Sequence, residues 1–414
     1  MIASKSKQML IRSFEKTAYT FKEKPIYRLS RNFGIYIHVP FCLSKCSFCS
    51  FYKEIYSEEM KQRYLQGVKR EILESHMEGN SNWIYIGGGT PNTLSIKELR
   101  DYIVSPLREK VQFDTLGIEL LPSLLSKDYL SELKSAGFTK ISMGIESFDN
   151  KVIELTGRKT GNGKTIIDLI RFAKSIGLFV SVDMMAGLPG QTDSSFLSDI
   201  KKSASLSPDQ IITYPYMILR GTENRSGLED HKQFELIEQA HQILGSSGYK
   251  RACVWTSQKG TDYYDSSRDE LVEDYIGFGP AAFSTFGGWK IVNPELAPYL
   301  KSMSNCRQMA FVAQKDPSTD MWRKFARMIY DLRCECSADL PFYINLLIRL
   351  LKISGYSTND LLNSKGKLFA NEITKTVVET LPFPIQNKSI VSNYREYLEY
   401  KTSNPSFSTP PDEN

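Results

Sequence analysis

Short apolar segments alternate with amphipathic segments over the first two thirds of the chain. The apolar segments carry Val, Ile, Leu and aromatic residues at successive positions, as expected for strands that are covered on both faces. They predict strands at 34–39, 83–86, 116–121, 140–145, 179–184 and 210–216. Apolar residues recur at helical spacing between them, which predicts helices at about 57–76, 96–107, 125–136, 164–176 and 194–204.

This alternation predicts an α/β fold built on a parallel (β/α) array. In barrels of this kind the reactive groups gather at the C-terminal ends of the strands. Side chains that follow each predicted strand are therefore the first candidates for chemistry. The loop after the first strand would lie in the mouth of the barrel.

The pattern changes near Asp316. Trp322, Phe325, Ile329 and Leu332 recur at helical spacing, and the segments 340–353 and 372–381 continue a helix-rich pattern. We therefore expect an N-terminal extension over 1–30, a barrel core over 31–315, a smaller helix-rich domain over 316–402 that caps the barrel mouth, and a disordered tail over 403–414. The segments 220–230 and 260–268 are expected to be surface loops or lids.

Composition and charge narrow the class of protein. The chain has 414 residues and a net charge of +5 that is spread without a basic block, so it carries no nucleic-acid footprint. The longest apolar runs are broken by polar residues such as Asn345 and Arg349, which argues against a transmembrane helix. The first residues lack the apolar segment of a signal peptide. We expect a soluble, cytoplasmic protein with reduced cysteines.

Three cysteines follow the first predicted strand. Cys42, Cys46 and Cys49 form a C-x3-C-x2-C pattern, and three thiolates on one short loop suit a [4Fe–4S] cluster whose fourth iron stays open. A structural zinc site would need a fourth ligand, which normally comes from a second pair. The remaining cysteines, Cys253, Cys306, Cys334 and Cys336, provide no such pair. His38 interrupts an apolar strand pattern, which favours a core or pocket-wall histidine.

A glycine-rich turn follows the second predicted strand. Gly87, Gly88 and Gly89 precede Thr90 and Pro91, and they would leave backbone groups accessible to a polar small molecule. Taken alone, the turn is equally compatible with a plain tight turn. Its position one strand after the cysteine loop favours a shared binding rim.

Together these residues resemble the radical S-adenosylmethionine (SAM) superfamily, and within it the oxygen-independent coproporphyrinogen III dehydrogenase-like group, including its class C radical methyltransferase relatives. The motifs occur in order over roughly residues 30–300: Tyr36-x-His-x-Pro-Phe-Cys, Gly87–Pro91, Glu119–Pro122, Ile141–Phe148, Gly157-Arg158, Asp183–Thr192 and Asp274–Ser284. The resemblance implies a partial (β/α)6 radical SAM barrel. It also implies a [4Fe–4S] cluster whose open iron binds SAM through the amino and carboxylate groups.

The resemblance implies a role for individual residues. Cys42, Cys46 and Cys49 would ligate the cluster on which catalysis depends, and Gly87, Gly88, Gly89 and Thr90 would hold the amino group of SAM. Further cofactor contacts fall on Tyr36, Phe48, Glu119, Glu146, Arg158 and Asp183. The segment 277–289 resembles a second pocket for another SAM molecule or a planar substrate, with Ala281 and Ala282 in its wall. A buried turn between domains is the alternative for this segment.

Three departures from the group's patterns bear on the reaction. Glu146 stands where many relatives have Gln, and an ionised carboxylate cannot donate a hydrogen bond. The His-Asn…Tyr-Trp element of the heme chaperones is replaced by the run 266–275, which weakens the chaperone reading. Ser50 and Phe51 follow Cys49, so the fourth cysteine of the coproporphyrinogen dehydrogenases is absent.

The sequence therefore favours an enzyme that cleaves SAM to a 5′-deoxyadenosyl radical and drives methyl or one-carbon transfer to an sp2 carbon of a planar acceptor. A tetrapyrrole, a quinone or a heteroaromatic compound would serve as acceptor. Oxidative decarboxylation of a porphyrinogen and non-catalytic heme carriage are the alternatives. The expected partners are a small-molecule substrate and an electron donor such as flavodoxin or ferredoxin.

Overall fold

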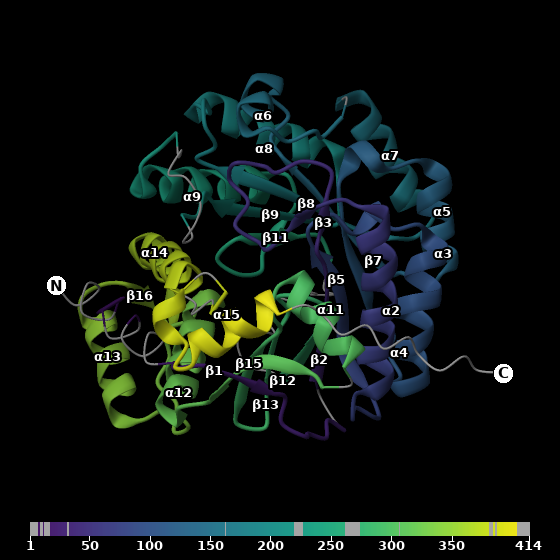
Figure 1. The fold of residues 1–414 in the computed structure, drawn as a ribbon. Coiled ribbons are helices and arrows are strands. Elements are labelled where there is room, and N and C mark those ends of the chain that lie inside the picture. Colours follow the sequence, from purple (N-terminus) through teal and green to yellow (C-terminus); the bar gives the residue numbers. More distant parts are fainter. Residues whose placement is uncertain are drawn as a thin grey trace.

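The computed structural model describes residues 7–8, 11, 17–30, 33–161, 163–218, 227–260, 274–305, 307–380, 384–385 and 387–403. Residues 404–414 of the expected tail over 403–414, residues 220–226 of the expected loop over 220–230 and most of the expected loop over 260–268 lie outside these residues. The described residues form a mixed α/β fold around one large sheet, with helices packed against it and a helix-rich region near the C-terminus (Figure 1).

Six parallel strands form the middle of the large sheet. They are β2 (Phe33–Val39), β5 (Ser81–Gly88), β6 (Leu116–Leu120), β7 (Lys140–Glu146), β8 (Phe179–Ala186) and β9 (Gln210–Pro215), each paired with the next. All six correspond to predicted strands. Their apolar side chains are buried on both faces, which is why the sequence reads as near-continuous apolar runs.

Helices connect these strands and cover the sheet. The predicted helices occur as α2 (Glu58–Glu74), α3 (Ile96–Leu99) with α4 (Ser105–Lys110), α5 (Lys127–Ser135), α7 (Gly163–Ser175) and α8 (Asp193–Leu206). A π-helical stretch, η2 (Arg100–Val104), interrupts the predicted helix 96–107. Two further helices, α6 (Asn150–Thr156) and α9 (Asp230–Ser246), were not predicted. Short 3-10 turns, η1 (Pro91–Thr93) and η3 (Pro122–Leu124), follow β5 and β6.

The sheet continues on both sides of the parallel strands with elements that the sequence did not predict. On one side are β12 (Asp274–Phe278), β13 (Phe283–Phe286), β14 (Trp289–Val292), β15 (Met309–Gln314) and β1 (Thr20–Glu23). On the other side are β11 (Thr256–Gln258) and β10 (Lys250–Arg251). Strand β12 runs parallel to β2, whereas β13, β14, β15 and β1 pair antiparallel in turn.

Strand β1 fastens the N-terminal segment to two distant parts of the chain. It pairs with β15, and the Asn393 side chain accepts from Phe21 N at 2.7 Å and donates to Phe21 O at 2.8 Å. Tyr19 N also donates to Ile390 O at 2.7 Å. The segment expected as an extension over 1–30 thus contributes a strand to the main sheet.

The C-terminal region is rich in helices, as predicted. It comprises α11 (Leu296–Ser304), α12 (Pro317–Tyr330), α13 (Phe342–Ile353), α14 (Ser364–Thr380), η4 (Lys388–Ile390) and α15 (Tyr394–Thr402), with the hairpin β16 (Ser357–Thr358) and β17 (Leu361–Leu362). Leu332 lies beyond α12 with a φ of 59°, so it does not continue the predicted helical pattern.

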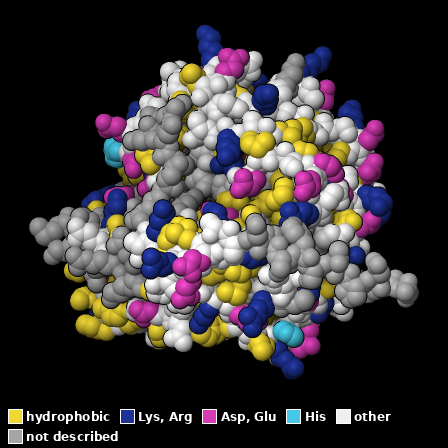
Figure 2. All heavy atoms as spheres, in the orientation of Figure 1, with side chains coloured by type: hydrophobic (Ala, Val, Ile, Leu, Met, Phe, Trp, Pro, Cys, Tyr) yellow, Lys and Arg dark blue, Asp and Glu magenta, His cyan; other side chains and the backbone are white. Residues whose placement is uncertain are grey.

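The C-terminal helices are joined to the barrel by polar contacts. Trp255 Nε1 donates to Asn371 Oδ1 on α14 at 3.0 Å, and Lys375 pairs with Asp230 at the start of α9. On its solvent-facing side α13 exposes Phe342 and Ile353, where apolar side chains gather in the space-filling view (Figure 2). Within the described residues, no helix is both long and apolar enough to span a bilayer.

Candidate cluster and cofactor site

The cysteine loop begins where the first parallel strand ends. After β2 the chain forms the short strand β3 (Phe41–Cys42), turns through Cys46 and Cys49, and returns beside β3 as β4 (Glu54–Ile55). The glycine-rich turn after β5 supports the start of this loop, because Gly89 N donates to Val39 O and Thr90 N donates to Phe41 O, both at 2.7 Å. The two predicted motifs therefore lie side by side.

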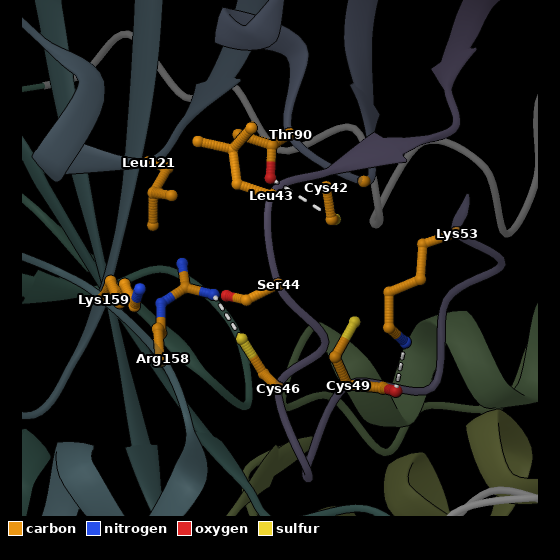
Figure 3. Close-up of a pocket in the computed structure, with 11 residues that line it drawn as sticks. Cys42, Leu43, Ser44, Cys46, Cys49, Lys53, Thr90, Leu121, Arg158 and Lys159 are labelled. Carbon is orange, nitrogen blue, oxygen red and sulfur yellow. Dashed lines mark hydrogen bonds between the residues drawn. The ribbon is translucent and has the colours of Figure 1, made fainter. Parts of the chain in front are cut away.

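Three thiols of this loop face one cavity (Figure 3). Thr90 Oγ1 lies 3.4 Å from Cys42 Sγ, Arg158 Nη1 lies 3.8 Å from Cys46 Sγ, and Lys53 Nζ donates to Cys49 O at 2.7 Å. The cavity has a volume of about 380 Å³, which includes space open to solvent. It is lined by Cys42, Leu43, Ser44, Cys46, Cys49, Lys53, Gly89, Thr90, Leu121, Arg158 and Lys159.

These thiols fit a cluster better than a single ion. Each described cysteine is a free thiol, so no disulfide competes for the three. Among the described residues, no three His, Cys, Asp or Glu side chains converge on a point that one metal ion could occupy. In a cubic cluster each cysteine binds a different iron, so convergence is not required. Burial raises the pKa of Cys42 to about 11 and also raises that of Cys46, so cationic irons would be needed to hold them as thiolates.

The glycines of the turn allow close packing. A Cβ atom on Gly88, whose φ is 110°, would lie 2.8 Å from the His38 ring, and one on Gly89 would lie 2.7 Å from Phe41 O. Any larger residue would therefore push the turn away from β2 and the cysteine loop. Packing alone accounts for Gly88 and Gly89, and contact of the turn with an amino group stays a prediction.

His38 is a neutral core residue beside the predicted cofactor contact Tyr36. Its Nε2 lies 2.9 Å from the carbonyl oxygen of Tyr52, and its Nδ1 lies 3.1 Å from the Tyr36 hydroxyl. Because a carbonyl can only accept, Nε2 carries the proton and Nδ1 accepts from Tyr36. Burial lowers the pKa of His38 to about 4, which keeps the ring neutral. The arrangement fixes the direction of the Tyr36 hydroxyl.

Three carboxylates that influence one another electrostatically lie on three neighbouring strands; one is buried, at Glu146, and the other two are partly buried. They belong to Glu119 on β6, Glu146 on β7 and Asp183 on β8. Ser142 Oγ donates to Asp183 Oδ2 at 2.7 Å, whereas Asp183 Oδ1 is buried without a hydrogen-bond partner. Burial raises the pKa of Glu119 to about 7, and burial together with the charge of nearby Glu146 raises the pKa of Asp183 to about 8. The raised pKa values show that negative charge is unfavourable at this site, and a ligand with cationic or hydrogen-bond-donating groups would compensate for it.

Arg158 connects these carboxylates to the cysteine loop. Its Nη2 donates to Gly144 O at 2.7 Å and lies 3.6 Å from Glu146 Oε1, while Nη1 approaches Cys46. Its guanidinium also lies over the Phe48 ring, 5.7 Å from the ring centre. The structure thus brings Arg158, Glu146, Phe48 and the cysteine loop together.

Ala281 and Ala282 lie apart from this cavity. Both are buried at the end of β12, and Ala281 has a φ of 59°. A Cβ atom on Gly277 would lie 2.1 Å from Phe283 O, so backbone of the following strand occupies the space beside this glycine. The segment expected to form a second pocket, 277–289, contains the paired strands β12 to β14, and neither alanine lines the cavity at the cysteines. Binding of a second SAM there stays a prediction.

Tyr214 is a site residue that sequence reasoning missed. Its hydroxyl donates to Glu146 Oε2 at 2.8 Å from the end of β9. A polar-tipped side chain near the end of a predicted barrel strand was the available signal.

A family model described as the radical SAM superfamily matches residues 36–202, which include the cysteine loop and all three carboxylates. This part of the chain is a radical SAM domain. This superfamily uses a [4Fe–4S] cluster together with SAM, in agreement with the three thiols on one loop.

The chain has relatives of two kinds. It is 28% identical over 280 residues to the heme chaperone HemW of Bacillus subtilis, which covers 62% of this chain and 72% of the relative. It is 27% identical over 274 residues to the oxygen-independent coproporphyrinogen III oxidase of Escherichia coli, covering 63% of this chain and 56% of the relative. These relatives support the coproporphyrinogen oxidase-like group within the superfamily. Neither name refers to methyl transfer.

The fold agrees with a solved structure. The coproporphyrinogen III oxidase of Escherichia coli, described as a radical SAM enzyme, superposes with a TM-score of 0.69 at 22% identity over 89% of this chain and 98% of the other. The similarity confirms the predicted fold class, a partial (β/α)6 barrel with a helix-rich C-terminal region.

Proposed function

We propose that Cys42, Cys46 and Cys49 hold a [4Fe–4S] cluster, and that the adjoining polar group binds SAM for reductive cleavage. The observation that carries this proposal is the position of Arg158. It lines the cysteine cavity, approaches Cys46 and pairs with Glu146, so it joins the cluster loop to the carboxylates. A single ligand could contact both the cluster and the carboxylates.

Different side chains would bind the different charged groups of SAM, which is zwitterionic. Arg158 provides a planar guanidinium for a carboxylate. Asp183 offers one unpaired acceptor oxygen, and Glu119 adds a second acidic group for ammonium or hydroxyl donors. When bound, the two cofactors supply one-electron cleavage of a sulfonium and removal of a hydrogen atom from a substrate. The apolar cluster around Phe48 would shield one side of that chemistry from water.

The proposed substrate is a planar small molecule of the tetrapyrrole type. The support is the pair of relatives, one named for heme and the other for coproporphyrinogen III. Oxidative decarboxylation is the reaction that the oxidase relative favours. The methyl transfer expected from the sequence would need a carbon donor. The backbone of Phe283 fills the space beside Gly277, which argues against a second SAM at that position.

Product analysis distinguishes the two reactions. Anaerobic protein would be reduced with dithionite and supplied with a porphyrinogen and methyl-labelled SAM. Decarboxylation releases carbon dioxide, leaves the product unlabelled and yields 5′-deoxyadenosine. Label in the product, with accumulation of S-adenosylhomocysteine, would establish methyl transfer instead.

Heme carriage is the second candidate function. It is favoured by the heme chaperone relative and would use the same fold without turnover. Stable binding of added heme by cluster-loaded protein, with no 5′-deoxyadenosine formed under any reductant, would select this candidate over the enzyme.

A further inference from the structure

Glu146 has an unusual backbone conformation at the end of β7. Its φ is 67°, and the residues on either side of it close a tight turn in which Ser147 N donates to Ile145 O at 2.8 Å. A hydrogen bond between residues two apart around a positive φ defines a γ-turn of the rare, strained kind. The register with β8 also shifts between Gly144 and Glu146. A residue other than glycine keeps this backbone conformation only if the surrounding structure holds it in place.

Asp199 on α8 holds the two residues that follow this turn. Ser147 Oγ donates to Asp199 Oδ2 at 2.5 Å, and Phe148 N donates to Asp199 Oδ1 at 3.1 Å. Asp199 is 5% exposed, and both of its oxygens are occupied by these donors. It does not line the cysteine cavity. Its contacts fix the backbone immediately after Glu146.

The turn aims the Glu146 carboxylate at the cofactor site. One oxygen accepts from the Tyr214 hydroxyl at 2.8 Å, and the other lies 3.6 Å from Arg158 Nη2. A relaxed strand at this position would send successive side chains to opposite faces of the sheet. Loss of the turn would therefore move this carboxylate away from Arg158.

We infer that Asp199 is a positioning residue that holds Glu146 in its left-handed turn and so sets the affinity of the site for SAM. The inference rests on the proposed SAM site. It predicts that Asp199 acts on the cofactor through Glu146 and by no other route.

A double-mutant cycle tests this dependence. SAM affinity would be measured by anaerobic equilibrium binding to cluster-loaded wild type, Asp199→Ala, Glu146→Ala and the double variant. Asp199→Ala should raise the Kd about tenfold in the wild-type background and less than about twofold in the Glu146→Ala background. Asp199→Asn should stay within about threefold of wild type, because an amide can still accept from Phe148 N and bond Ser147.

Two further variants keep the test decisive. Ser147→Ala removes one of the two bonds and should raise the Kd by about threefold even if Asp199→Ala fails to fold. Asp209→Ala is the matched control, because Asp209 anchors Val180 N at 2.9 Å and Lys174 Nζ at 3.0 Å away from the cofactor group. It should lower the melting temperature and leave the Kd unchanged.

The possible outcomes distinguish failure of the inference about Asp199 from failure of the proposed function. Equal loss of affinity in both backgrounds, or the same loss in Asp209→Ala, would show that Asp199 is merely structural and would overturn the inference alone. Wild-type protein with a full cluster and no measurable SAM binding would overturn the proposed function and the inference together.

Discussion

The two ends of the parallel strands treat buried charge in opposite ways. At the N-terminal ends the charged side chains have partners: Lys140 Nζ donates to Gln210 Oε1 at 3.0 Å, and the partly buried Asp209 accepts from Val180 N and Lys174. At the C-terminal ends, Asp183 keeps a buried oxygen without a partner, and Glu146 has a left-handed backbone. Buried polar groups in native proteins are normally paired. The neutral atoms Trp83 Nε1 and Ser181 Oγ are also buried without a partner, so the contrast concerns charged groups. It supports a ligand at the C-terminal ends.

The largest effect should follow removal of a cluster ligand. Cys42→Ala should abolish cluster absorbance and SAM cleavage, because two thiols on the loop cannot retain a cubic cluster. Iron analysis and 5′-deoxyadenosine formation after anaerobic reconstitution provide the measurements. Cys336→Ala, which removes an exposed free thiol, should keep both. Loss of iron in Cys336→Ala would contradict the assignment of the ligands.

Replacing the cationic side chain at one end of the strands should affect SAM binding, whereas replacing the one at the other end should affect stability. Arg158→Met should weaken SAM binding by about tenfold to hundredfold, because it removes charge-assisted hydrogen bonds to a carboxylate. Lys140→Met should lower the melting temperature and leave the Kd near wild type, because Lys140 pairs at the far end of the strands. An unchanged Kd in Arg158→Met would remove the contrast between the two ends.

The pH dependence of stability should depend on Asp183. Burial raises its pKa in the folded state to about 8 from an ordinary value of 3.8. Between these values the folded protein binds the extra proton, so stability is fully present below about pH 4 and falls as pH rises toward 8. In cluster-free protein, Asp183→Asn should reduce the loss of unfolding free energy between pH 5 and 8 by up to about 4 kcal/mol. If urea unfolding gave the same pH dependence of stability for wild type and Asp183→Asn, the prediction would be wrong.

A smaller effect should follow removal of the Glu146 charge. Glu146 helps raise the pKa of Asp183 by like-charge repulsion. Glu146→Gln should therefore lower the pKa of Asp183, so the fall in stability should end at a lower pH. The amide oxygen of the substituted side chain would still accept from the Tyr214 hydroxyl. Carbon-13 NMR of the Asp183 carboxyl would measure the shift. A pKa that stayed the same or rose would show that burial alone is responsible.

The parallel strands and the cysteine loop could be predicted because each follows from local pattern. Strands buried on both faces read as apolar runs, and Cys42, Cys46 and Cys49 are close in sequence. The resemblance to known motifs also identified Arg158, Glu119 and Asp183, which the structure places around one site. Their roles as cofactor contacts stay predictions.

Other features depend on contacts that no local pattern contains. Strands β12 to β15 are short and pair antiparallel with one another in turn, and Gly277 and Gly279 pack against neighbouring backbone. The left-handed turn at Glu146 depends on Asp199, which lies 52 positions from Ser147. The domain boundaries stay predictions, and the pairing of β1 with β15 shows that Thr20–Glu23 belongs to the large sheet.

The fastening of β1 has a consequence for synthesis on the ribosome. Phe21 is held by Asn393, 372 positions later in the chain. At about 5–20 residues per second, the strand emerges roughly 20 to 70 seconds before that partner exists. During this interval the outer edge of β1 lacks this partner. All described strands of the large sheet have been synthesised once translation has passed residue 314, whereas the outer edge of the sheet at β1 is covered only after residue 393.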